Sequence, residues 1–240
     1  MKVKLFFIRK TKAMFIRLKL HVLVEPFSGF LINLIYLSKM SKWAATNRKK
    51  IPYNDFYTSK WNYDNRIKIY EYIFETEKLD APITYIEFGV CGGHSIRWWV
   101  QQNQHTETQF YGFDTFEGLP ENFGPFKAGS MTVDAIPDIK DKRVQFIKGL
   151  FQDTVSTFLK TFSRKNKLVL HMDADLYSST LYALSQLHSY LKVGDIIVFD
   201  EFSVPKHEFL AFKNFTESHY INLQPIAAAN NYYCTAFKVV

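Results

Sequence analysis

Two pairs of acidic residues follow apolar runs in the second half of this 240-residue chain. Asp173 and Asp175 follow one run, and Asp200 and Glu201 follow the next. If neighbouring parallel strands carry both pairs, the side chains meet at one sheet edge, because adjacent strands lie about 4.8 Å apart. Carboxylates that close repel one another, and Mg²⁺ relieves the repulsion through oxygen ligands. We predict a metal site of Asp173, Asp200 and Glu201; helix caps or solvated turns are the alternative for either pair alone.

A glycine-rich turn forms a second chemical feature. An apolar, β-prone run containing Glu87 leads into Gly89 and Gly93, and a helix-like segment follows. Strand, glycine turn and helix open a doubly wound α/β domain, which binds ligands at the carboxyl ends of its strands. The dinucleotide fingerprint is missing, because Cys91 and His94 stand where its second and third glycines belong. The spacing resembles motif I of the class I S-adenosylmethionine (SAM) methyltransferases; a plain glycine-containing turn is the alternative.

Further strands must position these groups. Residues 109–114 form a predicted strand ending in Asp114, whose carboxylate could accept the ribose hydroxyls of a nucleoside or could be a solvated turn residue. Residues 115–130 hold glycines and prolines without periodicity and read as a lid near the cofactor. A hairpin around residues 230–231 ends the chain. The predicted fold is α/β: a doubly wound, mostly parallel seven-stranded sheet, Rossmann-like, with a C-terminal antiparallel hairpin.

Charge divides the chain into two parts. The net charge is +7, but residues 1–50 hold twelve Lys or Arg and one acid, so they carry +11 and the remainder carries −4. An acidic body without a base-flipping motif argues against nucleic acid as a partner. We predict a basic, aromatic-rich leader at 1–50 and a catalytic domain at 51–240. The two cysteines, Cys91 and Cys234, form no disulfide framework or zinc pattern and fit a reducing, cytoplasmic location.

The leader matches no secretory signal, because basic residues interrupt its apolar groups. Its most apolar run, residues 22–37, contains Glu25 and Pro26 and is shorter than the roughly 20 residues of a spanning helix, so no transmembrane helix is predicted. A basic, aromatic segment can lie on the anionic inner face of a membrane. The alternatives are that it packs on the core, joins a second subunit in a homo-oligomer, or covers the substrate pocket.

Five ordered motifs then resemble the macrocin O-methyltransferase family, and the resemblance covers roughly residues 60–240. The motifs are Glu87-Phe88-Gly89-Val90-x-x-Gly93-x-Ser95, Gly112-Phe113-Asp114-Thr115-Phe116-Glu117-Gly118-Leu119-Pro120-Glu121, Gly149-Leu150-Phe151-x-Asp153-Thr154, Asp173-Ala174-Asp175-Leu176-Tyr177-x-Ser179-Thr180 and Asp200-Glu201-Phe202. Enzymes of this family use SAM and Mg²⁺ to methylate sugar hydroxyls of macrolides, and the substrates of many relatives are unknown.

The resemblance implies roles for individual residues. It assigns the metal to Asp173, Asp200 and Glu201. The second acid after the apolar run that ends at Phe199 is often Asp in the family, whereas this chain has Glu201. As a mechanistic hypothesis, Asp173 is the predicted catalytic residue, because it could both bind the metal and accept the proton. His94 and His171 are other candidate bases, but a polar residue at a helix start is the favoured interpretation of His94, and a core histidine is that of His171. The resemblance assigns the methionine part of SAM to Glu87, Gly89 and Gly93 and the ribose to Asp114. We also predict that Ser95, Gly149 and Asp173 bind the cofactor.

The expected function is therefore Mg²⁺-assisted O-methyl transfer from SAM to a small-molecule or glycan acceptor, a sugar or a secondary metabolite. The leader does not resemble the amino-terminal region of the macrolide enzymes, so a macrolide acceptor is not implied. The alternative is a non-catalytic protein that keeps the fold for binding or assembly and docks through its leader. A nicotinamide oxidoreductase ranks third, because the glycine fingerprint is missing.

Overall fold

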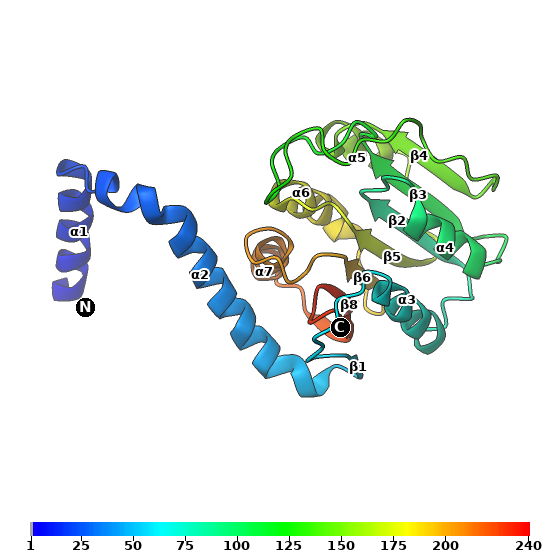
Figure 1. Cartoon of the computed structure of the whole chain (residues 1–240), viewed down its shortest axis with the longest axis horizontal. Helices are drawn as coiled ribbons and strands as arrows, with labels where there is room; N and C mark the ends of the chain where they lie inside the picture. The colour runs from blue at the N-terminus through cyan, green and yellow to red at the C-terminus, as the bar shows by residue number, and fades with distance from the viewer. Residues whose placement is uncertain (1) are drawn as a thin grey trace.

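The computed structural model describes residues 2–240. One sheet with helices on both faces forms the body, and two N-terminal helices extend away from it (Figure 1). The helices are α1 (Lys2–Arg17), α2 (His21–Asn47), α3 (Asn65–Thr76), α4 (His94–Gln102), α5 (Phe151–Leu159), α6 (Tyr177–Leu187) and α7 (Glu208–His219), with 3₁₀ turns at Arg48–Lys50 and His188–Tyr190. The strands are β1 (Tyr53–Asn54), β2 (Ile83–Phe88), β3 (Gln109–Asp114), β4 (Val144–Lys148), β5 (Lys167–Met172), β6 (Ile196–Phe199), β7 (Leu223–Ala229) and β8 (Cys234–Val239).

The sheet has eight strands in the order β1-β7-β8-β6-β5-β2-β3-β4. β8 is antiparallel to β6 and β7, and the other neighbouring pairs are parallel. The predicted fold class, with its C-terminal antiparallel hairpin, is confirmed. The strand count of seven is wrong by one, because β1 adds a parallel pair in which Tyr53 lies opposite Ala227. Two residues are too few to leave an alternating hydrophobic pattern in the sequence.

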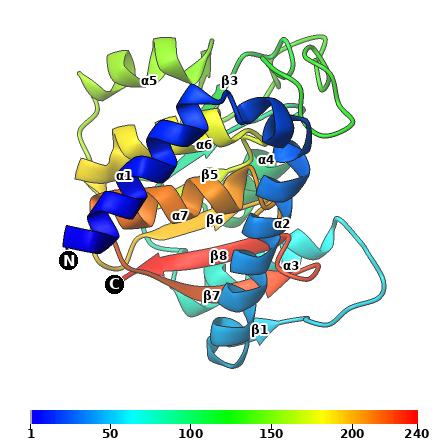
Figure 2. The same ribbon diagram turned by 90° about the vertical axis from the view of Figure 1, so that its left-hand side faces the viewer.

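Both faces of the sheet are covered. Helices α5, α6 and α7 lie on one face, and α3 and α4 lie on the other (Figures 1 and 2). Every residue of β2 and of β6 is buried, as expected for strands of a sheet that helices cover on both faces. The largest buried groups on the α3 and α4 face include Tyr70 and Trp99, whereas Phe199 and Phe215 lie on the opposite face.

The N-terminal arm, defined here as residues 2–39, projects from the body (Figures 1 and 2). No side chain from residue 3 to residue 39 is buried, and Met40 is the first that is. Trp43 then attaches α2 to the body, with its ring centroid 4.7 Å from Phe202 and 5.7 Å from Tyr232.

By length and composition alone, the helical segment His21–Lys50 could cross a membrane, and its most apolar window has a mean hydropathy of 1.3. The apolar run of residues 22–37 did not indicate this by itself. Signal sequences can have the same length and composition. Buried core helices can too, but no side chain of this window is buried.

Candidate active site

The glycine turn between β2 and α4 lies against the end of β5. Gly89 has a φ of +92°, and a Cβ at this position would lie 1.7 Å from the carbonyl oxygen of Asp173. Gly93, also left-handed with φ +75°, immediately precedes α4. Only glycine adopts such a conformation with so little space beside it. The turn therefore brings the first amides of α4 to the edge of the sheet where Asp173 lies.

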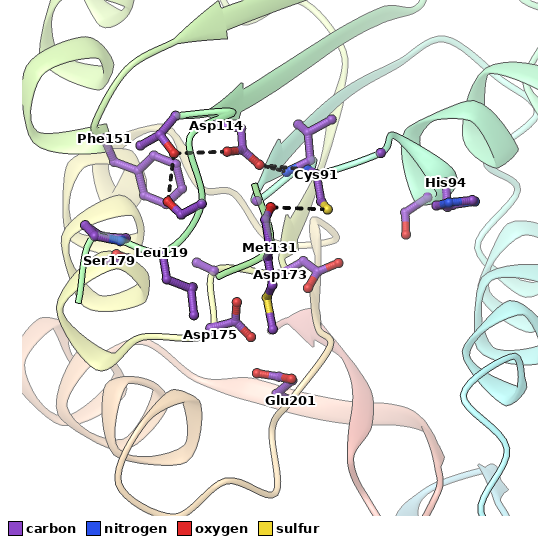
Figure 3. A pocket seen from close by; sticks show the side chains of 18 of the residues that line it. Cys91, His94, Asp114, Leu119, Met131, Phe151, Asp173, Asp175, Ser179 and Glu201 are labelled. Atoms are coloured by element: carbon purple, nitrogen blue, oxygen red, sulfur yellow. Dashed lines mark hydrogen bonds between the residues drawn. The ribbon is translucent and has the colours of Figure 1, made fainter. Parts of the chain in front are cut away.

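Asp114, at the end of β3, holds the glycine turn in shape. Its Oδ2 accepts hydrogen bonds from the amides of Val90 at 2.8 Å and Cys91 at 2.7 Å, and its Oδ1 accepts one from Phe116 at 2.7 Å. Figure 3 shows the Asp114 carboxylate directed at the turn. A carboxylate has about four acceptor sites, and the Thr115 hydroxyl occupies the fourth only weakly, at 3.5 Å from Oδ1, so a ribose hydroxyl would compete with it. The assignment of Asp114 to a ribose stays a prediction.

A cavity of about 260 Å³ opens beside this turn. Its wall comes from the glycine turn, the irregular 115–131 loop, the start of α5 and the residues after β5 and β6 (Figure 3). The loop segment predicted as a lid contributes Leu119 and Pro120, so it does line the cavity, although its opening is untested. Cavities lined by apolar groups with a few convergent polar ones are typical ligand sites.

The acidic residues after β5 and β6 come together as the sheet order requires. The two strands are adjacent, with Met172 opposite Phe199, and the Asp200 amide donates to the Met172 carbonyl at 3.0 Å. Asp173 and Asp200 belong to a group whose potential ligand atoms lie within 4.8 Å of one another. Asp173, Asp175 and Glu201 all line the cavity and point into the same space (Figure 3).

The third member of that group is His171, whereas the sequence predicted Glu201. His171 is fully buried, and both ring nitrogens are already engaged: Nδ1 lies 2.8 Å from the Tyr85 hydroxyl and Nε2 lies 3.2 Å from the Tyr70 hydroxyl. Mg²⁺ also prefers oxygen to imidazole nitrogen. We therefore interpret His171 as a structural support behind the acids. This position makes it a poor candidate base, since it does not line the cavity formed by the described residues.

The electrostatics show that negative charge exceeds positive charge in this cluster. Burial raises the pKa of Asp173 well above its ordinary value, and the neighbouring Asp200 carboxylate raises it further. Burial, together with the neighbouring Asp175 carboxylate, raises the pKa of Glu201 to about 9. Within residues 2–240, Asp200 Oδ1 and Glu201 Oε2 are buried without a hydrogen-bond partner. Either protons or a cation must compensate these acids.

Aromatic hydroxyls and one guanidinium complete the cluster, and the sequence analysis missed all of them. Tyr63 donates to Asp200 Oδ2 at 2.6 Å, and Tyr233 donates to Glu201 Oε1. Arg66 lies with Nη1 3.7 Å from Asp200 Oδ2. Asp175 was noted but given no role; it has a φ of +56°, which turns its carboxylate toward the cavity (Figure 3). Its left-handed conformation left no signal in the sequence.

The remaining predicted residues divide between the cavity wall and the layer behind it. Gly89, Ser95 and Asp114 line the cavity, as does His94. Glu87 is buried behind the turn, where it accepts a hydrogen bond from Tyr85 at 2.6 Å, and it is not part of the wall. Gly93 and Gly149 are also absent from the described wall, although their neighbours Gly92 and Leu150 belong to it. Contact of these residues with SAM stays a prediction.

A comparison with protein families matches residues 64–238 to the model described as Macrocin-O-methyltransferase (TylF). The chain belongs to the macrocin O-methyltransferase family. The match covers the body from the residue before α3 to the penultimate residue of β8, and it includes all four acids of the cluster. The resemblance inferred from the five motifs is thereby confirmed.

Relatives in this family include an enzyme of Streptomyces olivaceus named 8-demethyl-8-(2,3-dimethoxy-alpha-L-rhamnosyl)-tetracenomycin-C 4'-O-methyltransferase. It is 29% identical over 166 residues, which cover 58% of this chain but only 60% of the relative's length. Among solved structures, the calicheamicin methyltransferase CalS11 superposes with a TM-score of 0.58 at 20% identity, covering 72% of this chain and 78% of that one. A CmcI structure whose title names Mg and SAM has a TM-score of 0.51 at 17% identity, with 78% of each chain covered. These two likenesses support the fold.

Proposed function

We propose that this protein is a SAM-dependent, Mg²⁺-assisted O-methyltransferase. The observation that carries the proposal is the gathering of Asp173, Asp175 and Glu201 on the wall of a cavity whose other side is the glycine turn, with Asp200 directly behind. Membership of the macrocin O-methyltransferase family supports it. Because the relatives named above are enzymes, they lend no support to a non-catalytic binding protein.

The proposed cofactor site uses the turn and the strand ends. The methionine end of SAM would lie at Gly89, Gly93 and Ser95, where the start of α4 presents free amides. The ribose would add its hydroxyls to Asp114, and the segment from Gly149 to α5 would meet the adenine. Glu87, which is buried behind the turn, would also help to hold the methionine end of SAM. When bound, SAM supplies a methyl group on a sulfonium, which an aligned acceptor oxygen can take.

The residues present fit a hard divalent cation. Asp173 and Asp200 offer oxygen atoms within 4.8 Å of one another. The buried atoms Asp200 Oδ1 and Glu201 Oε2 accept no hydrogen bond among the described residues, so they are available as metal ligands. Mg²⁺ held by Asp173, Asp200 and Glu201 would lower the pKa of an acceptor hydroxyl. Arg66 supplies part of the positive charge that Asp200 needs, and a cation would supply the rest.

The protein's own groups would position the acceptor and take its proton. Asp173, the predicted catalytic residue, and Asp175 both face the cavity, and both have raised pKa values, chiefly through burial. Raising a carboxylate's pKa toward neutrality makes it a better general base. Leu119 and Pro120 of the 115–131 loop cover the cavity and would exclude water during transfer.

We propose a sugar or secondary-metabolite hydroxyl as acceptor, because the S. olivaceus relative is named for a rhamnosyl-bearing substrate. The proposal includes a cytoplasmic location, in keeping with two free cysteines. Contact of the leader, residues 1–50, with a membrane, and assembly into a homo-oligomer, also remain proposals.

Two measurements test the activity. Calorimetry with S-adenosylhomocysteine should give a binding isotherm, and Asp200→Asn should leave that affinity unchanged. Methyl transfer from radiolabelled SAM to cell glycan and small-molecule fractions should require the wild-type chain and should fall after chelation of divalent cations. Normal transfer by Asp200→Asn in metal-free buffer would refute the metal assignment. A lack of S-adenosylhomocysteine binding would refute the proposed function as a whole.

A further inference from the structure

The N-terminal arm exposes an unusual amount of apolar surface. Nineteen large apolar side chains between residues 3 and 37 are each at least 40% exposed, out of 29 such side chains in the described chain. They include Phe6, Phe7 and Phe15 in α1 and Phe27 and Phe30 in α2. Soluble monomers rarely leave contiguous apolar surface of this extent uncovered. Something other than the protein's own body must cover the arm, since its contacts with the body begin only at Met40 and Trp43.

The charge of the arm indicates what covers it. Residues 2–19 carry seven Lys or Arg and no acid, and Glu25 is the only acid before residue 51. A second copy of the arm would bring these like charges together, which costs free energy. An anionic lipid surface offers both an apolar layer and negative headgroups, each basic residue near it contributing about 1 kcal/mol. We propose that the N-terminal arm docks the protein peripherally on an anionic lipid bilayer.

The arrangement of charges favours lying in the interface over crossing the bilayer. Basic residues flank the apolar segment on both sides: seven in residues 2–19, and Lys39, Lys42 and the Arg48–Lys50 turn after it. Cytoplasmic flanks carry the excess of Lys and Arg, so charge on both sides keeps both ends of the segment on one side of the membrane. The helical segment His21–Lys50 is long enough to cross the bilayer, but its apolar run of residues 22–37 would span only about 24 Å, against a hydrocarbon core of about 30 Å.

The attachment point of the arm lies next to the candidate active site. The Trp43 ring packs 4.7 Å from that of Phe202, and Phe202 directly follows Glu201. The amide of Phe202 also donates to the Tyr233 carbonyl, and the Tyr233 hydroxyl contacts Glu201. Docking through the arm would therefore hold this part of the body close to the lipid surface. The docking does not depend on the proposed methyl transfer.

Flotation of the full chain with vesicles tests the docking. Vesicles of equal parts phosphatidylglycerol and phosphatidylcholine should carry the protein upward, vesicles of phosphatidylcholine alone should carry much less, and raised salt should weaken the first result. The variant Arg9→Glu/Lys10→Glu/Lys12→Glu should bind the anionic vesicles about a hundredfold more weakly. A matched control, Lys142→Glu/Lys165→Glu/Lys192→Glu, alters three exposed lysines of the body and should bind nearly as well as wild type.

A second variant, Leu23→Ser/Phe27→Ser/Phe30→Ser, should also lose vesicle binding while keeping its affinity for S-adenosylhomocysteine, because these three side chains are each more than 60% exposed and lie before the first buried residue, Met40. Equal flotation of wild type and the charge variant would overturn the proposal. So would light scattering that shows a stable oligomer dispersed by the serine variant, since the arm would then be a subunit interface. Resistance of the membrane-bound protein to extraction by alkaline carbonate would overturn the peripheral arrangement in favour of a spanning helix.

Discussion

The Tyr63 hydroxyl lies 2.6 Å from Asp200 Oδ2 and donates a hydrogen bond to it, while the Arg66 guanidinium lies 3.9 Å from the centroid of the same tyrosine ring. Tyr63 precedes α3, and Asp200 follows β6, so the bond joins two distant parts of the chain. Groups that hydrogen-bond a metal ligand orient it and tune its affinity. Tyr63 is therefore placed to fix the Asp200 carboxylate for a cation.

Tyr63→Phe should weaken Mg²⁺ binding by about 10- to 100-fold, because Asp200 loses the donor that orients it. Titration of methyl-transfer activity with Mg²⁺ measures the effect as a shift of the half-saturating concentration. Tyr57→Phe is the matched control, since Tyr57 is 72% exposed and lies in the same connecting segment. An unchanged Mg²⁺ dependence in Tyr63→Phe would show that the hydrogen bond has no bearing on the metal.

Asp175→Asn tests which carboxylate takes the proton. The amide keeps the size of the side chain but cannot act as a base, so kcat should fall by about 10²- to 10⁴-fold if Asp175 is that base. S-adenosylhomocysteine affinity and Mg²⁺ dependence should stay near wild type, which separates this variant from Asp200→Asn. Rapid turnover by Asp175→Asn, together with a dead Asp173→Asn, would return the role to Asp173.

Much of the sheet and of the acid cluster was predictable because each acid directly follows a buried strand. Asp173 and Asp200 needed only the adjacency of β5 and β6, and this adjacency is what the βα alternation implies. Tyr63 and Arg66 could not be found in the same way. Both residues contact Asp200, which lies far away in the sequence. Their neighbours in the sequence look no different from those of a tyrosine or an arginine on an exposed surface.

Two elements near the N-terminus show the same limit, β1 and α2. The two-residue β1 is defined by its partner β7, so no periodicity in the sequence could reveal it. The apolar run at residues 22–37 was visible, but its extension into one long helix ending at Asn47 was not, because polar residues dominate the last turns. Contacts made across the fold, such as Trp43 with Phe202, define where that helix joins the body.

Glu77 joins two strands through ion pairs, and its removal should lower stability. Its carboxylate contacts Lys167 of β5 at 3.0 Å and Lys238 of β8 at 2.9 Å. Burial alone would raise the pKa of Glu77, but the hydrogen bonds from Lys238 and Lys167 outweigh it, so the pKa lies below its ordinary 4.5. Glu77→Gln should lower the free energy of unfolding at neutral pH by about 1 kcal/mol, as measured by chemical denaturation.

The pH dependence of this effect has a definite sign. A depressed carboxyl pKa stabilises the folded state above the unfolded-state pKa, and that stabilisation is lost as pH falls through the folded-state value. The difference between wild type and Glu77→Gln should therefore be fully present at pH 7 and shrink below about pH 4.5. Glu217→Gln is the control, because its partner Lys213 lies one helical turn away and Glu217 is 63% exposed. A difference that grows on acidification would contradict the ion-pair explanation.

Gly89 permits the closest approach in the site, and alanine there should be severely destabilising. The new Cβ would lie 1.7 Å from the Asp173 carbonyl oxygen and 2.6 Å from its carbon, and these backbone atoms cannot move without displacing the end of β5. Alanine at a φ of +92° adds backbone strain, so the free energy of unfolding should fall by about 3 kcal/mol or more.

Gly29→Ala is the matched control in α2, where no atom lies within 4 Å of the added Cβ. It should leave the free energy of unfolding unchanged or raise it slightly, because alanine favours a helix more than glycine does. Thermal unfolding of both variants, with S-adenosylhomocysteine binding measured on each, distinguishes the two positions. A stable Gly89→Ala variant that still binds the ligand would mean that the turn does not need this close contact with Asp173.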